Sequence, residues 1–190
     1  TGESFSIKTL NQVEAVDGVR AAAGSLSRTV NLPAGWFGRD APINAVSLVG
    51  LDPRAAQRIR NYPVKQGRFL RTGDDESAVI TASLADQLGL TLGDELNLPT
   101  TQGTVPLTIV GILPARTLPG NEEVLVTLYE AQKLFDLPRR INTIEANLNT
   151  TDAERRDAIE KNIETLLGAE YRLGALASGT ELFASLQLGQ

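Results

Sequence analysis

The sequence predicts an α+β fold made of two subdomains. Strand–helix–strand patterns stand at both ends of the chain, over residues 5–32 and 141–173. A strand–helix–strand–strand pattern lies between them, over residues 78–113. The total of 190 residues is enough for one large domain or two small ones.

The two end patterns set the expected boundaries. We expect residues 1–62 and 139–180 to form one β-α-β layer, because patterns of the same kind can pair in a common sheet. Residues 63–138 are then a mixed α/β subdomain inserted into that layer. Residues 181–190 remain as a tail.

The central pattern is the clearest in the chain. Ala78–Ile80 is a short apolar run that leads into a helix over Ala82–Leu88, and Gly89 follows where a left-handed residue ends a helix. Leu96 and Leu98 then alternate with polar residues, as in a half-buried strand. The loop 100–103 ends in a glycine, which predicts a hairpin into a second strand over residues 105–112.

The N-terminal pattern begins with a short strand around Phe5. Thr9-Leu10-Asn11-Gln12 has the T-x-x-Q form of a capping box, so a short helix is expected to start there. Gly18 ends that helix, and a long strand follows from Val19 to Leu32. Further strand and helix signals continue along the chain, at residues 44–51, 53–60, 124–128 and 129–137.

The C-terminal pattern contains the most regular helix. This helix follows a strand that ends at Leu148, and it starts at a second capping box, residues 151–154. Its apolar residues share one face: Ile159, Ile163, Leu166 and Leu167. After a last strand near Tyr171, apolar residues 182, 183, 186 and 188 follow at helical spacing. This tail is expected to be the juxtamembrane start of a membrane helix or a frayed terminus.

Composition argues against several function classes. A net charge of −5 and the scarcity of basic pairs argue against nucleic-acid binding. The chain has neither cysteine nor histidine, which excludes a thiolate metal site, a Ser-His-Asp triad and an HExxH zinc site. We therefore expect no catalytic residue, no metal and no cofactor, and we do not expect an enzyme, although a hydrolase that uses only carboxylates stays as an alternative. The acidic turn at residues 72–77 lacks the ligand pattern of an EF-hand and is expected to be solvated.

The loop Leu32–Asp40 holds the candidate contact site. Trp36 is the single tryptophan of the chain, and Phe37 follows it, with Gly35 and Gly38 on either side. Glycines let the backbone turn sharply and can raise aromatic side chains to a surface where they meet a partner or a substrate. The alternative is a satellite hydrophobic cluster folded under the loop.

Five segments, in order, carry a resemblance to a known family. ITASLADQLGLTLGDELNL (80–98), followed by LTIVGIL (107–113), resembles the core of the MacB-like periplasmic domain of FtsX-like ABC transporter permeases. Three outlying segments fit the same pattern, at residues 49–53, 66–70 and 124–132. The resemblance implies a porter-like subdomain for residues 1–62 and 139–180 and a sabre-like subdomain for residues 63–138.

The resemblance also implies a function. The chain is then the extracytoplasmic domain of a bacterial cytoplasmic (inner) membrane permease, which couples ATP-driven movement of membrane helices to export or extraction of a substrate. This mechanotransmission implies a cytoplasmic ATP-binding subunit, a second permease copy or homologue, and a periplasmic adaptor or substrate protein as a further partner. The alternative is a stand-alone extracellular module that binds a ligand or a partner.

Overall fold

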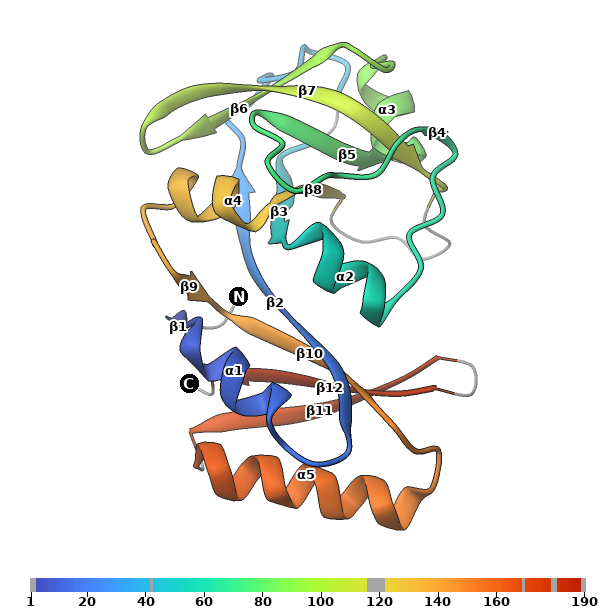
Figure 1. The fold of residues 1–190 in the computed structure, drawn as a ribbon. Coiled ribbons are helices and arrows are strands. Elements are labelled where there is room, and N and C mark those ends of the chain that lie inside the picture. The colour runs from blue at the N-terminus through green and yellow to red at the C-terminus, as the bar shows by residue number, and fades with distance from the viewer. Residues whose placement is uncertain (1–2, 42, 116–121, 169, 179–180, 189–190) are drawn as a thin grey trace. The chain divides into compact units, whose positions relative to one another are not determined.

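The computed structural model describes residues 3–41, 43–115, 122–168, 170–178 and 181–188 (Figure 1). The chain forms two units, each with its own internal packing. Unit 1 holds Thr1–Leu26, Arg54–Asn61 and Arg139–Gln190, and unit 2 holds Ser27–Pro53 and Tyr62–Pro138. The predicted α+β class is confirmed, because each unit combines a sheet with short helices.

Unit 1 is an antiparallel sheet that both ends of the chain build together. Its strand order is β11-β12-β10-β2, and every neighbouring pair is antiparallel. A separate pair, β1 with β9, joins the first residues to the segment before β10. The elements are β1 (Phe5–Ser6), α1 (Lys8–Glu14), β2 (Val19–Asn31), α2 (Pro53–Ile59), β9 (Arg140–Ile141), β10 (Thr143–Leu148), α5 (Ala153–Leu167), β11 (Tyr171–Ser178) and β12 (Glu181–Leu188).

The core of unit 1 follows the two-residue period of its strands. Ile144, Ala146 and Leu148 alternate along β10 and are buried. Ile144 pairs with Gly24, whose missing side chain leaves room for Ile141. On the other face of β2, Ala23 packs against Ile59 of α2.

Residues 181–188 of the expected tail belong to this sheet, so the expectation of a helix start or a frayed end is wrong for them. Residues 181–188 form β12, which pairs with β10 along one side and with β11 along the other. Leu182, Leu186 and Leu188 are all even-numbered, so the spacing that suggested a helix also fits a strand. The free edge of β10 and the hairpin with β11 favour the strand.

Two further details of unit 1 differ from the expectations. Helix α1 starts one residue before Thr9, so Thr9 lies inside the helix and is buried, and Ile7 at the N-cap makes no side-chain cap hydrogen bond. The hydroxyl of Thr9 lies 3.5 Å from that of Tyr171, a partner that only the folded chain provides. Leu166 of α5 is 51% exposed rather than buried.

Unit 2 is a mixed sheet. Its path runs β2-β3-β8-β5-β7-β4, and β6 pairs with β7. β3 and β8 are parallel, β8 and β5 antiparallel, and β5 and β7 parallel. The elements are the end of β2, β3 (Ala45–Leu51), β4 (Gln66–Gly67), β5 (Ser77–Thr81), α3 (Ala82–Leu88), β6 (Glu95–Thr100), β7 (Gly103–Leu113), β8 (Glu123–Thr127) and α4 (Leu128–Leu134).

The division between the units differs from the expected boundaries. Residues 27–53, expected with the two chain ends, belong to unit 2. The reason is the length of β2, which spans 13 residues. Its first half pairs with β10, and its second half continues into the strand order of unit 2 beside β3.

Two strand–helix steps of the same design lie side by side in unit 2 (Figure 1). β5 ends at Thr81 and β8 ends at Thr127, and each threonine is the N-cap of the helix that follows. The Thr81 hydroxyl accepts a hydrogen bond from Leu84 N–H at 3.4 Å, and the Thr127 hydroxyl accepts one from Glu130 N–H at 3.3 Å. Since β5 and β8 are antiparallel, the two helices begin at opposite ends of the strand pair.

A glycine lets α4 lie close to the sheet. A Cβ atom at Gly50 of β3 would lie 2.2 Å from the Cβ of Ala131, far inside van der Waals contact. Two small residues therefore fix the position of α4 on β3. In the part of the chain that the structure describes, none of the helices is long and apolar enough to cross a membrane.

Candidate functional site

The loop with Trp36 and Phe37 is built from tight turns between β2 and β3. Trp36 N–H donates to Pro33 O at 3.0 Å, and Gly38 N–H donates to Gly35 O at 2.9 Å. Gly35 and Gly38 have φ angles of 72° and 108°, a region that favours glycine. The expected turning role of these glycines is therefore confirmed.

Trp36 and Phe37 are both half-buried, and they line a common groove. The Trp36 indole Nε1 donates to the backbone oxygen of Asn97 in β6, at 2.9 Å. The groove has a volume of about 430 Å³, and its other walls come from α3, β6, β7 and the turn after α3. They are Leu88, Leu90, Glu95, Leu96, Asn97 and Thr104. The two predicted site residues thus lie together, and their contact role stays a prediction.

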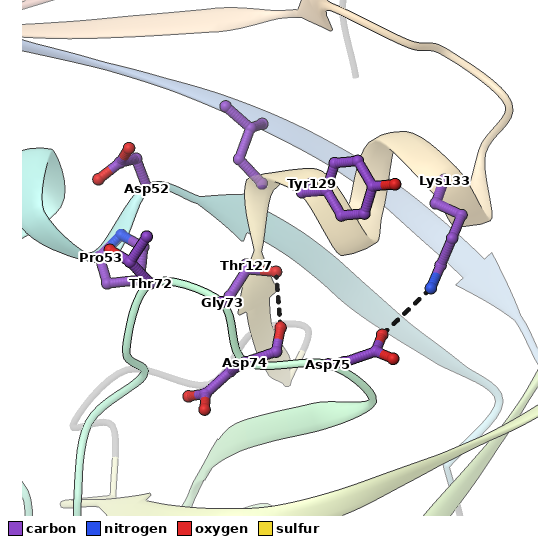
Figure 2. Close-up of a pocket in the computed structure, with 10 residues that line it drawn as sticks. Asp52, Pro53, Thr72, Gly73, Asp74, Asp75, Thr127, Tyr129 and Lys133 are labelled. Carbon is purple, nitrogen blue, oxygen red and sulfur yellow. Dashed lines mark hydrogen bonds and ion pairs between the residues drawn. The ribbon is translucent and has the colours of Figure 1, made fainter.

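A second pocket, with more charged residues in its walls, lies at the start of α4 (Figure 2). Its volume is about 540 Å³. It is lined by Asp52, Pro53, Thr72, Gly73, Asp74, Asp75, Thr127, Leu128, Tyr129 and Lys133. The acidic turn at residues 72–77 therefore forms one wall of a pocket.

Asp74 is the anchored carboxylate of this turn. Arg68 donates to both of its oxygens, at 2.9 and 3.1 Å, and Arg71 N–H donates at 2.8 Å. Burial alone would raise the pKa of Asp74, but the hydrogen bonds from Arg68 and Arg71 outweigh it and hold that pKa below its usual value. The charge of the Asp74 carboxylate is thus balanced by an ion pair with Arg68. This corrects the expectation that the acidic turn is solvated, as far as Asp74 is concerned.

Lys133 joins two further carboxyl groups. Its Nζ lies 3.1 Å from Asp75 Oδ1, drawn in Figure 2, and 3.2 Å from Glu130 Oε2. Burial raises the pKa of Glu130, and the neighbouring Asp75 raises it further. The pKa of Asp75 is lowered by a hydrogen bond from Glu130 and then by Lys133. The pKa values of Glu130 and Asp75 are thus shifted in opposite directions, and Lys133 lies within ion-pair distance of both carboxyl groups.

This cluster was missed in the sequence, although a signal for it exists. Thr127-Leu128-Tyr129-Glu130 has the T-x-x-E form of a capping box, which places Glu130 against the start of its helix. What the motif does not show is that Asp75 and Lys133 meet there, or that Glu130 is only 1% exposed. Among the described residues, no group of three or more acidic, histidine or cysteine side chains is placed to hold a metal ion.

Comparisons with known proteins agree with the fold. A family model described as the MacB-like periplasmic core domain matches residues 1–166. The extracellular domain of the noncanonic ABC-type transporter YknZ from Gram-positive bacteria has a TM-score of 0.64 at 18% identity, over 86% of this chain and 82% of that chain. The periplasmic region of MacB from Actinobacillus actinomycetemcomitans has a TM-score of 0.63 at 14% identity, over 87% of this chain and 75% of that chain.

No curated protein matches the chain in sequence. At such low identities the two structures establish the fold, whereas the family match rests on the sequence itself. That match covers residues 1–166 of 190, which include all of unit 2 and the part of unit 1 up to residue 166, before β11. The chain belongs to the family of MacB-like periplasmic core domains.

Proposed function

We propose that this chain is the extracytoplasmic domain of an ABC transporter permease in a bacterial cytoplasmic membrane. The observation that carries the proposal is the family match over residues 1–166. The likeness in fold to the extracellular domain of YknZ and the periplasmic region of MacB supports it.

In this proposal the domain transmits movement and catalyses no reaction. A cytoplasmic ATP-binding subunit supplies the energy, and the membrane helices of the permease and of a second permease copy or homologue carry the movement outward. The domain then moves a substrate on the outer side of the membrane, with an adaptor or substrate protein as a further partner.

The groove beside Trp36 and Phe37 is the contact surface we propose for such a partner. It combines two half-buried aromatic side chains with Leu88 and Leu90, next to the exposed residues Glu95 and Asn97. Aromatic residues with a polar rim are typical of binding surfaces.

Labelling of a single introduced cysteine tests the topology. The chain contains no cysteine, so Thr101→Cys, at an exposed position in the β6–β7 turn, gives this domain one thiol. In intact cells that express the full permease, we expect a membrane-impermeant maleimide to label the variant and not the unmodified permease. Labelling only after permeabilisation would refute an extracytoplasmic location. Recovery of the native protein in the secreted soluble fraction would favour the stand-alone binding module.

The coupling needs a second measurement. A spin label on Thr101→Cys in the assembled transporter reports distances to a label on the partner permease. We expect the distance to change when a non-hydrolysable ATP analogue binds. An unchanged distance, in a transporter whose ATPase is active, would refute the transmission of movement to this domain.

A further inference from the structure

β6 is an edge strand with free backbone groups. In the described part of the chain it pairs with β7 alone. Ile109 N–H donates to Asp94 O at 2.9 Å, which fixes the alternation of the antiparallel ladder. Leu96 and Leu98 then bond to β7, and the N–H groups of Glu95 and Asn97 point away from it. Both residues are exposed.

One outward group of this edge is already occupied. The Asn97 oxygen accepts the Trp36 indole N–H at 2.9 Å, as the backbone N–H of a neighbouring strand would donate to it. Among the described residues, none accepts a hydrogen bond from the N–H groups of Glu95 and Asn97 in this way. Beside the edge lies the groove of about 430 Å³, with Phe37, Leu88 and Leu90 in its walls.

We infer that the β6 edge binds an extended polypeptide segment with basic side chains, which adds to the sheet as a further strand. The N–H groups of Glu95 and Asn97 need carbonyl acceptors two residues apart, which only an extended backbone offers at that spacing. The groove takes an apolar side chain of the segment. This inference deepens the contact role proposed above for Trp36 and Phe37 and rests on that part of the proposal.

Charge selects the basic segment. Among the described residues that line the groove, Glu95 alone is charged, and it is exposed. A lysine or arginine of the added strand placed opposite Glu95 forms a cross-strand pair of opposite charge, whereas an acidic residue there is repelled. The net charge of the chain, −5, acts in the same direction.

The Trp36 indole occupies the hydrogen-bonding position at the Asn97 oxygen that an added strand would use. When the segment binds, its backbone N–H competes with the indole for the Asn97 oxygen, so the indole environment changes. The same contact has a second interpretation, in which Trp36 only protects the edge from pairing, as edge strands commonly require. The two interpretations differ in whether the edge can accept a strand at all.

Titration of the 190-residue chain with defined peptides decides between them. The probe is a blocked heptapeptide of alternating valine and lysine, and binding is followed by the amide NMR signals and by Trp36 fluorescence. We expect saturable shifts centred on the Glu95 and Asn97 amides, with a change in Trp36 emission. A peptide of alternating valine and glutamate, and a valine–lysine peptide with N-methylated alternate amides, should each bind at least about tenfold more weakly, since each loses a charge pair or backbone hydrogen bonds.

Asn97 offers a matched pair of variants. Asn97→Pro removes the outward N–H without touching the ladder to β7, and it should weaken binding about tenfold. Asn97→Ala keeps that N–H, so it should bind more tightly than Asn97→Pro. Trp36→Phe removes the competing indole donor and should tighten binding by about two- to tenfold.

Three results would each overturn the inference: no saturable binding, shifts centred away from β6, or equal binding of the N-methylated peptide. The comparison with the N-methylated peptide uses the native chain, so it tests the inference even if Asn97→Pro fails to fold. The cysteine labelling of the full permease is unaffected by these outcomes, so failure here and failure of the proposed topology are distinguishable.

Discussion

The close approach of α4 to β3 in unit 2 gives a sharp test of the structure. A Cβ placed at Gly50 would lie 2.2 Å from the Ala131 Cβ and 3.3 Å from the Leu128 Cα. Carbon atoms pack at about 3.5–4.0 Å, so Gly50→Ala must push α4 outward by roughly 1 Å or more. Overpacking of this kind typically costs about 1–3 kcal/mol of the free energy of unfolding. For a chain of this size the melting temperature should fall by roughly 2–4 °C per kcal/mol.

The partner residue turns this into a double-mutant cycle. Ala131→Gly alone should cost about 1–2 kcal/mol, from the difference in helix propensity and the loss of a buried methyl group. Combined with Gly50→Ala it removes the clashing atom, so the double variant should be more stable than Gly50→Ala. Chemical denaturation with urea measures all four proteins, and we expect a favourable coupling of about 1 kcal/mol or more.

A control separates this coupling from general effects of glycine replacement. Gly35 has a φ of 72° and open space around the position of a Cβ, so Gly35→Ala costs backbone strain but no clash. Its effect should simply add to that of Ala131→Gly. Additive behaviour of the Gly50 pair as well would show that α4 does not lie on β3 as described.

Four further predictions concern the site and the tail. Glu130→Gln keeps a group that can donate a hydrogen bond to Asp75. Because folding raises the pKa of Glu130, the stability that this group contributes is present at low pH and is lost as the pH rises through that pKa. The variant should therefore gain stability relative to the native chain between acidic and neutral pH, as measured by urea denaturation across pH. The pKa of Asp74 is lowered, so its contribution is present at neutral pH and lost as the pH falls; Asp74→Asn should cost about 1–3 kcal/mol at neutral pH and nothing once the native carboxyl is protonated. Trp36→Ala should lower the free energy of unfolding by about 1–2 kcal/mol, because it removes one hydrogen bond and a half-buried ring. A fully buried aromatic side chain would cost ~3–5 kcal/mol, and a loss in that range would contradict the contact role. Ending the chain at Ser178 removes β12, which pairs on both sides, so thermal unfolding should shift strongly downward, whereas an unchanged melting curve would contradict the strand.

The parts of the fold that could be predicted from sequence are those encoded by near neighbours. The helix over residues 82–88 and its left-handed Gly89, with a φ of 64°, depend on side chains within four positions of one another. The hairpin of β6 and β7 likewise follows from alternation and a glycine at residue 103. The longest of the motifs that resemble the family lies in the same segments, within the matched residues 1–166.

The tertiary structure alone decided which of several local options was used. Residues 181–188 fit a helix or a strand equally well by spacing, and the free edge of β10 selected the strand. Thr9 could cap a helix or lie within one, and its burial beside Tyr171, 162 residues away, favoured the latter.

The candidate site depends on the same distant contacts. Trp36 could be recognised in the sequence as an unusual residue, but its bond to Asn97, 61 residues away, and the open edge beside it exist only after β6 and β7 have paired. Lys133 meets Asp75 across 58 residues, and the raised pKa of Glu130 comes first from burial, which no local pattern of charges specifies. Spacing along the chain determines which elements form, whereas the closing of long loops determines which polar groups are buried together and which backbone edges stay open.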